Sequence, residues 1–332
     1  MNFKFKRAMR TAAILIMMTA VAVALIYFGK QEDKSAFENM PLNLSGNISP
    51  DDKFMEDMEQ IKFHAYEKRI KYISKMLESE ADTPVNTLPN NGSKDKSLEQ
   101  KIRDYLGKNV SKVGIGYYDI QNGKGFSING DKYFTAASTV KVQMNMVLFD
   151  MVKEGKVDIN EALKYTQADY EAGTGILQGK DKTNPIPLLT LSDYSIIYSD
   201  NIATNMIMRR IGRTEMKKRF GQKVGHTVPV ENLVTPNEGL TFLKQLYENK
   251  GNNQYYTRLI GIMKTTVFHD RLDAYVPKEI VAHKIGNYGS FANDVGIVYA
   301  PKPYIIAVYT DGLSNANEVI ATINKMLYQE HK

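Results

Sequence analysis

The sequence predicts an α+β fold, in which helices flank an antiparallel sheet and an all-α lobe is inserted into the chain. Runs rich in Val, Ile and Tyr, typical of strands, occur near both ends of the region from about residue 97 to residue 332. The intervening residues, from about 142 to 263, mostly have the apolar spacing of helices. One sheet is therefore expected to form from N-terminal and C-terminal segments, with the helical middle as the inserted lobe.

The first 29 residues have the pattern of an export segment. Basic residues up to Arg10 precede an uncharged run from Thr11 to Gly29 that is mostly Ala, Ile, Leu, Met and Val. A basic flank stays in the cytoplasm, so the rest of the chain is expected to cross the membrane. Small residues at 20–24 would allow cleavage of a signal segment, but the apolar run continues beyond them and favours a membrane anchor. We therefore expect an exported bacterial protein, anchored on the extracytoplasmic face of the membrane.

Residues 30–96 are predicted to be a linker that contains one charged amphipathic helix, at about 51–81. Apolar residues recur there mostly three or four positions apart, from Phe54 to Leu77, among many charged residues. Such a helix fits a membrane-proximal stalk or a self-association element, and a solvated helix without a partner explains the pattern equally well. A stretch rich in turn formers, 83–93, separates it from the domain expected at 97–332.

The elements of this domain are expected in a simple order. Ser97 can cap a first helix that ends near Leu106, with Gln100 in the capping-box position. The dipeptide at 122–123, Asn-Gly, then joins two strands into a hairpin. Further helices are expected at 142–154, 188–197, 202–211, 213–220 and 238–249, strands at 113–120, 125–128, 280–285, 294–300 and 304–310, and a last helix at 315–329.

The composition excludes several kinds of chemistry. The chain has no Cys, which removes disulfides, thiolate nucleophiles and Cys-ligated metals. Its formal charge of +6 is spread along the chain without an Arg-rich helix, so no nucleic-acid partner is expected. The five His residues are interpreted as structural, and no His or carboxylate cluster in the sequence indicates a metal. We therefore expect neither a metal nor another cofactor.

The stretch Phe134–Val142 contains a candidate nucleophile. If a helix begins near Ser138, then Lys141 lies three positions later on the same face. Serine needs an adjacent base, and a desolvated lysine with a lowered pKa can supply one. The helix N-terminus would also offer N–H groups to an oxyanion. Ser93 and Lys96 have the same spacing in a polar segment, so the pattern needs support from the rest of the chain.

Two later motifs supply that support, Ser-Asp-Asn at 199–201 and Lys-Ile-Gly at 284–286. Ser-x-x-Lys, Ser-Asp-Asn and Lys-x-Gly in this order resemble the signature of class A β-lactamases and penicillin-binding proteins. The resemblance extends from about Ser97 to the C-terminus and includes His269–Leu272 and Asn293–Val298 around the third motif. It implies a β-lactamase/DD-peptidase-like fold and a serine hydrolase that works through an acyl-enzyme.

The resemblance implies a role for each catalytic residue. Ser138 would attack the substrate carbonyl and become acylated, and Lys141 would accept its proton. Ser199 would pass a proton to the leaving nitrogen. General acid–base catalysis requires the serine hydroxyl to be within hydrogen-bond reach of that nitrogen. We therefore expect Ser138, Lys141 and Ser199 to be catalytic.

The resemblance also implies substrate-binding groups. Asn201 would hold a substrate amide, whereas Asp200 would face the protein and brace the turn. Lys284 would recruit a substrate carboxylate, and its charge would help to lower the pKa of Lys141. We therefore expect Asn201 and Lys284 to contact the substrate.

The third motif also departs from the family. Gly286 would leave room for the substrate, and the backbone N–H groups of Ser138 and Asn287 would form the oxyanion hole. Ile285, however, stands where class A enzymes carry Thr or Ser. A hydroxyl expected to bind the substrate carboxylate is therefore missing, which should weaken that recognition.

A second departure concerns deacylation. Class A enzymes use a Glu in an acid-x-x-Leu-Asn pattern, and the corresponding segment here, 225–236, is shortened and lacks that pattern. Glu231 is its only carboxylate, and a plain surface residue is the simpler interpretation. Without a positioned base, an acyl-enzyme is expected to hydrolyse slowly.

The expected activity is hydrolysis of a β-lactam or a related cell-wall amide through acylation of Ser138. One alternative is a D-alanyl-D-alanine peptidase that resembles penicillin-binding proteins. Another is a sensor or binding module that a β-lactam acylates once, with little turnover. In each case the expected partner is a small β-lactam or a cell-wall peptide.

Overall fold

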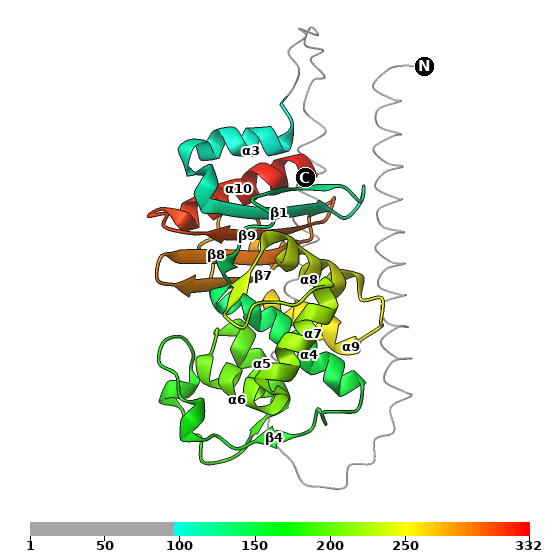
Figure 1. Ribbon diagram of the computed structural model, residues 1–332, viewed down its shortest axis with the longest axis vertical. Coiled ribbons are helices and arrows are strands. Elements are labelled where there is room, and N and C mark those ends of the chain that lie inside the picture. The colour runs from blue at the N-terminus through cyan, green and yellow to red at the C-terminus, as the bar shows by residue number, and fades with distance from the viewer. Residues whose placement is uncertain (1–95) are drawn as a thin grey trace, which may run out of the picture. The chain divides into compact units, whose positions relative to one another are not determined.

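A computed structural model of the chain describes residues 96–332 (Figure 1). The expected export segment, the linker and the amphipathic helix at 51–81 lie outside these residues. Within residues 96–332, no helix combines the length and the apolarity that are needed to span a membrane.

A five-stranded antiparallel sheet forms the centre of the domain. Its strands are β1 (Val113–Asp119), β2 (Gly125–Ile128), β7 (Val281–Tyr288), β8 (Phe291–Val298) and β9 (Tyr304–Thr310). The order in the sheet is β2-β1-β9-β8-β7, so strands from the two ends of the domain pair directly, as the sequence predicts. β7 is an edge strand, so one side of its backbone is left for contacts outside the sheet.

Helices cover both faces of the sheet and form the inserted lobe. They are α3 (Leu98–Leu106), α4 (Val140–Lys153), α5 (Leu188–Ile197), α6 (Asn201–Ile211), α7 (Arg213–Val224), α8 (Pro236–Glu248), α9 (Gln254–Met263) and α10 (Ala316–His331). α3 and α10 lie together on one side of the sheet, and α8 packs on the other side (Figure 1). α4, α5, α6 and α7 form the lobe, which confirms the predicted helical insertion.

Shorter elements connect these helices and strands. They are the 3-10 helices η1 (Gly107–Lys112), η2 (Ala137–Thr139), η3 (Gln167–Asp169), η4 (Leu177–Gly179) and η5 (Lys278–Ile280), and the pairs β3 (Phe134–Thr135) with β6 (Leu233–Val234) and β4 (Ala162–Leu163) with β5 (Ile186–Pro187). The predicted helices do not include α9. Asn253 caps this helix by accepting a hydrogen bond from the N–H of Tyr255, so its start signal lies in a stretch that resembles a plain turn.

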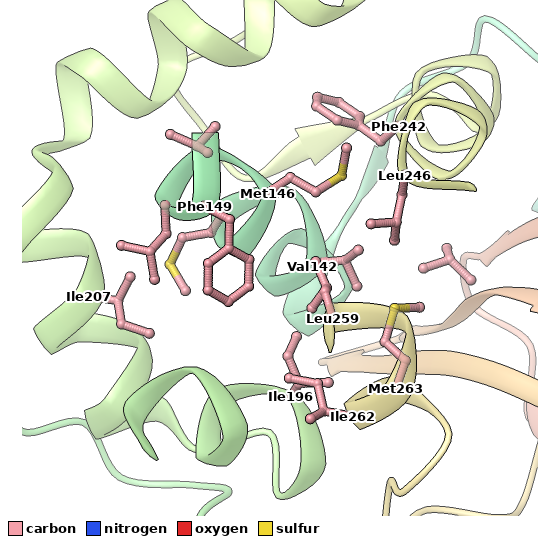
Figure 2. Close-up of a cluster of buried hydrophobic side chains, with 14 of the residues drawn as sticks. Val142, Met146, Phe149, Ile196, Ile207, Phe242, Leu246, Leu259, Ile262 and Met263 are labelled. Carbon is pink, nitrogen blue, oxygen red and sulfur yellow. The ribbon is translucent and has the colours of Figure 1, made fainter. Parts of the chain in front are cut away.

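Helix α4 lies at the centre of the apolar core of the lobe (Figure 2). Its residues Met146 and Phe149 are fully buried in a cluster that also contains Ile207 of α6 and Leu259 of α9. A helix that is buried on nearly all sides needs no polar face, which explains the apolar sequence of α4. Truncation of Phe149 to Ala would cost about 3–5 kcal/mol of stability. This packing holds the start of α4, and with it the candidate nucleophile, in a fixed position.

Candidate active site

Ser138 lies in η2, in the turn that leads into α4. The preceding Ala137 has a φ of 50°, a left-handed conformation. This conformation costs a non-glycine residue roughly 1–3 kcal/mol and is found most often at functional sites. Two amide side chains hold the turn: Asn232 donates to the carbonyl oxygen of Ala137 at 3.1 Å, and Asn293 donates to that of Ala136 at 3.2 Å. The strained backbone is therefore supported from two sides.

Lys141 lies one turn further along α4 and is almost completely buried. Its Nζ donates to the backbone oxygen of Ser199 at 2.6 Å, to Oγ of Ser199 at 3.3 Å and to Oδ1 of Asn201 at 2.8 Å. Burial lowers the pKa of Lys141 to about 8, against the opposing effect of the Glu171 and Asp200 charges. In about a tenth of the molecules Lys141 is therefore neutral at pH 7. Only the neutral amine can act as a general base.

Ser199, between α5 and α6, is the point at which the three motifs meet. Its Oγ accepts a hydrogen bond from Lys284 at 2.9 Å in addition to the longer one from Lys141. Its φ is 52°, and Thr174 donates to its carbonyl oxygen at 2.8 Å. The side chain is almost fully buried. A hydroxyl fixed between two amines in this way can pass a proton without bulk water.

Asp200 braces the same turn, as the sequence predicts. Its Oδ1 accepts from the N–H of Ala203 at 2.9 Å and so caps α6. Its Oδ2 accepts from the N–H groups of Ile176 and Leu177 at 2.7 and 2.8 Å. This one buried carboxylate therefore ties the preceding loop to the start of α6.

The loop at 170–175 completes this side of the site, although no motif in the sequence indicates a role for it. The carbonyl oxygen of Ala172 accepts from Nδ2 of Asn201 at 3.1 Å, and Glu171 accepts from Asn205 at 2.9 Å. Gly173 and Gly175 of this loop have positive φ, a conformation that favours glycine. These glycines are the only feature of the sequence that marks the loop. Because both ends of the Asn201 amide already have partners in the protein, a substrate amide would share this side chain with them.

Lys284 lies on β7 and is fully buried. Its Nζ donates to Oγ of Ser199 and to the carbonyl oxygen of Ile285, each at 2.9 Å. Burial and then the charge of Lys141 hold the pKa of Lys284 well below its usual value. The main cause of the lowered pKa of Lys141 is therefore burial, and not the charge of Lys284 that the sequence suggested. Burial lowers the pKa of Lys141, and the repulsion between the amines suppresses the charge of the more deeply buried Lys284.

Gly286 brings the backbone of β7 against the nucleophile turn. A Cβ atom on this residue would lie 2.8 Å from the carbonyl oxygen of Ala136 and 3.1 Å from the backbone N of Ser138. Only glycine permits so close an approach without displacing the turn. The approach is what an oxyanion hole shared by the N–H groups of Ser138 and Asn287 requires, and that role of Asn287 stays a prediction.

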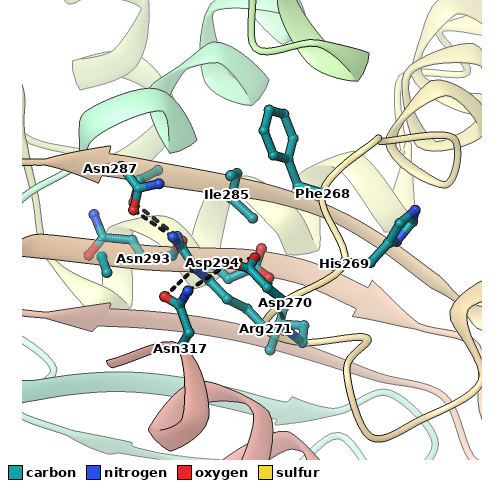
Figure 3. Close-up of polar contacts among 12 residues, drawn as sticks. Phe268, His269, Asp270, Arg271, Ile285, Asn287, Asn293, Asp294 and Asn317 are labelled. Carbon is teal, nitrogen blue, oxygen red and sulfur yellow. Dashed lines mark hydrogen bonds and ion pairs between the residues drawn. The ribbon is translucent and has the colours of Figure 1, made fainter. Parts of the chain in front are cut away.

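Arg271 supports the same strand, a role that the sequence does not indicate. Its guanidinium donates at 3.1, 2.6, 2.5 and 2.9 Å, respectively, to the carbonyl oxygens of Gly286 and Asn293 and to the side-chain oxygens of Asn287 and Asn317 (Figure 3). Its rigid fork of donors therefore connects the loop before β7 to β7, β8 and α10. Arg271 therefore fixes the side-chain oxygen of Asn287 next to the backbone N–H that is expected to take part in the reaction.

The segment at 225–236 contacts the nucleophile turn through a neutral amide. Asn232 makes that contact, whereas Glu231 is exposed and its carbonyl oxygen accepts from Lys217 at 2.7 Å. If Asn232 is taken as the Asn of the acid-x-x-Leu-Asn pattern, the acid would stand at position 228. The chain has Val228 there, half-buried against the core of the lobe. Among the described residues, no hydrogen bond or ion pair joins the carboxylate of Glu231 to the nucleophile turn.

The sequence indicates no His and carboxylate cluster, but the structure brings one together. His269, Asp273 and His283 lie together, with one potential ligand atom of each within 4.8 Å of the others. They meet because the loop before β7 returns along the strand, which their separation in the sequence did not reveal. His283 points to the face opposite Lys284, as the alternation of a strand predicts, and its Nδ1 lies 2.8 Å from Oδ2 of Asp294.

In this α+β domain, two buried lysines donate to the hydroxyl of Ser199, and Lys141 lies one helical turn from Ser138. This arrangement is the one expected of serine hydrolases that react through an acyl-enzyme. Comparison with known families makes the assignment specific. The chain belongs to the β-lactamase enzyme family, which matches residues 97–331. It is therefore a serine β-lactamase-like enzyme, as the motifs predicted.

Individual relatives agree with this assignment. The chain is 31% identical to a β-lactamase of Bacillus licheniformis over 221 residues, which are 60% of this chain and 71% of that protein. It is 24% identical to β-lactamase SME-1 of Serratia marcescens over 263 residues, 70% of this chain and 87% of that protein. The solved structure of PBP-A has a TM-score of 0.65 and 26% identity, over 74% of this chain and 98% of that chain. A PBP-A mutant in an acyl-enzyme complex with penicillin G also has a TM-score of 0.65 and 26% identity, over 70% and 95%. These likenesses confirm the predicted β-lactamase-like fold.

Proposed function

We propose that the enzyme hydrolyses a β-lactam or a related cell-wall amide through acylation of Ser138. The supporting observation is the Ser199 hydroxyl, which accepts hydrogen bonds from both Lys141 and Lys284. A structural role alone would not need two desolvated lysines on one hydroxyl, because burial of each amine costs free energy. A reaction that moves a proton from a nucleophile to a leaving group does need such a connection.

In the proposed reaction, Oγ of Ser138 forms a bond to the carbonyl carbon while neutral Lys141 takes the hydroxyl proton. The N–H groups of Ser138 and Asn287 stabilise the oxyanion. The C–N bond then breaks, Ser199 gives its proton to the leaving nitrogen, and the Lys141 ammonium restores that proton. These steps leave Ser138 acylated and Lys141 neutral.

We assign substrate binding to the edge of β7 and to the second motif. Lys284 recruits the substrate carboxylate, and an anion beside this buried amine would favour its charged form. Gly286 leaves space for the ligand next to the nucleophile turn. Asn201 offers its amide to the amide side chain of the substrate.

Deacylation is the slow step of this proposal. The exposure of Glu231 and the apolar Val228 leave an attacking water without a positioned base. The same observation favours a second candidate function, a D-alanyl-D-alanine peptidase or a sensor that a β-lactam acylates once. The likeness to PBP-A, of which a mutant is seen as an acyl-enzyme with penicillin G, supports this candidate.

Labelling and turnover of the full-length protein test both proposals together. We expect stoichiometric labelling by a fluorescent penicillin, and with a chromogenic cephalosporin a stoichiometric burst followed by slow turnover. Ser138→Ala should abolish the label, whereas Ser93→Ala, which removes the other Ser-x-x-Lys pair, should label like the wild type. A folded wild-type protein that takes no label would disprove acylation. Rapid multiple turnover would instead disprove slow deacylation.

We also propose that residues 1–29 export the chain and anchor it on the extracytoplasmic face of the membrane. The support is the uncharged run from Thr11 to Gly29 behind a basic flank. Fractionation should place the full chain with the membrane, and protease added outside the membrane should digest it. Removal of residues 1–29 should release the domain, and sedimentation of a chain that begins at residue 30 tests self-association through the helix expected at 51–81. Recovery of the full chain in the soluble fraction would contradict the anchor.

A further inference from the structure

Strand β7 carries a second polar cluster on the face opposite Lys284. His283 is fully buried there, and its Nδ1 lies 2.8 Å from Oδ2 of Asp294 on β8. Its Nε2 lies 3.4 Å from Oδ2 of Asp273, without the alignment of a hydrogen bond. Within residues 96–332, this buried nitrogen therefore has no hydrogen-bond partner.

Asp273 presents a second unsatisfied atom to the same place. The residue is 1% exposed, and its Oδ1 has no hydrogen-bond partner among the described residues. Its Oδ2 lies 2.5 Å from Nδ1 of His269. A buried polar atom without a partner costs about 1–3 kcal/mol, and more when the group is charged. Two such atoms, on a pair of buried side chains that approach each other to 3.4 Å, indicate a ligand at this place.

We propose that His269, Asp273 and His283 bind a divalent transition-metal ion, and that the ion is Zn²⁺. Two imidazole nitrogens and one carboxylate oxygen suit zinc, whereas Mg²⁺ and Ca²⁺ prefer oxygen ligands alone. The three ligand atoms lie within 4.8 Å of one another. Tetrahedral bonds of about 2.0–2.2 Å place ligand atoms roughly 3.3–3.6 Å apart. Nδ1 of His269 would therefore move away from Oδ2 of Asp273, which a small rotation of the exposed His269 allows. The fourth position would be filled by water.

Asp294 supplies the support that a metal-binding histidine needs. Its contact with Nδ1 of His283 leaves Nε2 as the ligand atom, an arrangement that fixes the ring orientation in metal sites. Oδ2 of Asp294 also accepts from the backbone N–H of Leu272 at 3.1 Å, directly before Asp273. One buried carboxylate therefore positions ligands from both the strand and the loop. The side chain of His269 is 36% exposed, so an ion can enter from solvent.

The ion joins the loop between α9 and β7 to the strand that carries the third motif. The same loop holds Arg271, which donates to the carbonyl oxygen of Gly286 beside the nucleophile turn. The role of the metal is therefore to stabilise this connection, and its site is separate from the acyl-transfer residues. The competing explanation is an ion-pair cluster, since against the cost of burial Asp294 and Asp273 raise the pKa of His283 to about 9.

Calorimetric titration of the chelator-treated full chain with ZnSO₄, together with thermal unfolding, distinguishes the two explanations. We expect one zinc ion per chain and a Tm that rises with zinc concentration. His269→Gln should weaken zinc affinity by about 10–100-fold and remove the rise in Tm. His226→Gln is the matched control, because it changes an exposed histidine that pairs with Glu238 elsewhere and should bind zinc like the wild type.

A second variant and a second ion keep the test decisive if buried substitutions disturb the fold. Asp273→Asn should also lose zinc binding, with folding checked by circular dichroism. Co²⁺ added to the wild type should give a visible spectrum typical of tetrahedral nitrogen and oxygen ligands. The ion-pair explanation would prevail if the wild type bound no zinc, or if folded His269→Gln and Asp273→Asn both bound it unchanged.

Discussion

The two sides of the nucleophile turn differ in kind. On one side, the hydroxyl of Ser199 is held by two buried lysines, Lys141 and Lys284, in direct hydrogen bonds. On the other side, the segment at 225–236 gives the turn one neutral amide, that of Asn232, and leaves its carboxylate in solvent. The first side has the groups that acylation needs, whereas the second lacks the base that deacylation needs.

In the proposed reaction, the two half-reactions depend on separate parts of the fold. The lysines belong to α4 and β7, which the core and the central sheet hold rigidly. The deacylation segment lies between α7 and α8, and its contact with the turn is structural. A change in that segment can therefore slow the second step while the first is retained. Predictions about the two sides should accordingly be separable in experiment.

Loss of the base on the acylation side should have the largest effect. Lys141→Ala should slow acylation by about 10²–10⁴-fold, the usual contribution of a general base. Stopped-flow labelling with a fluorescent penicillin measures this rate. Lys153→Ala, at the exposed other end of α4, is the matched control and should leave the rate unchanged. A folded Lys141→Ala protein that labels at the wild-type rate would exclude this lysine as the base.

The pH dependence of acylation should be nearly as large. Lys141 must be neutral to accept a proton, and burial lowers its pKa to about 8 against Glu171 and Asp200. The rate should therefore rise about tenfold from pH 6 to 7, about fivefold from pH 7 to 8 and about twofold at most above, because the neutral fraction does so. Lys284 does not reverse this rise of the rate with pH, because burial already holds the pKa of Lys284 well below its usual value. Labelling rates measured at constant ionic strength would show a flat profile if another group were the base.

A carboxylate placed on the deacylation side should raise turnover by a smaller factor. Val228→Glu would put an acid at the position that the family pattern assigns to it, and we expect deacylation to accelerate at least about tenfold. Release of label from the isolated acyl-enzyme measures the effect. Val230→Glu, which adds the same charge at an exposed position nearby, should leave the rate unchanged. If both variants accelerated deacylation equally, the added negative charge alone would explain the acceleration.

Much of this site could be predicted because its motifs are short and each has a fixed local geometry. Ser138 and Lys141 share one helical turn, and the alternation of a strand places Lys284 and Gly286 on one face. The bond by which Asp200 caps α6 could also be anticipated, since helix caps are local. These positions needed no knowledge of the loops between the motifs.

What could not be predicted depends on contacts between loops and distant strands. Arg271 was visible only as part of a sequence resemblance, and its four oxygen partners come from β7, β8 and α10. His269, Asp273 and His283 likewise meet only after the loop returns along β7. To predict which lysine has its pKa lowered more, Lys141 or Lys284, requires their relative burial, and a motif does not encode burial. Tertiary burial therefore decided each of these outcomes.

The smallest predicted effect concerns the third motif itself. Ile285→Thr would restore the hydroxyl that class A enzymes carry, and one added hydrogen bond to a substrate carboxylate is worth about 1.5–3 kcal/mol at most. Because Ile285 is buried and its apolar contacts would be lost, we expect only about a threefold to tenfold decrease in KM for acylation. Ile285→Val is the matched control, since it shortens the side chain without adding a hydroxyl and should not lower KM. If threonine and valine changed KM alike, the deficit would lie in packing, and Lys284 alone would account for carboxylate recognition.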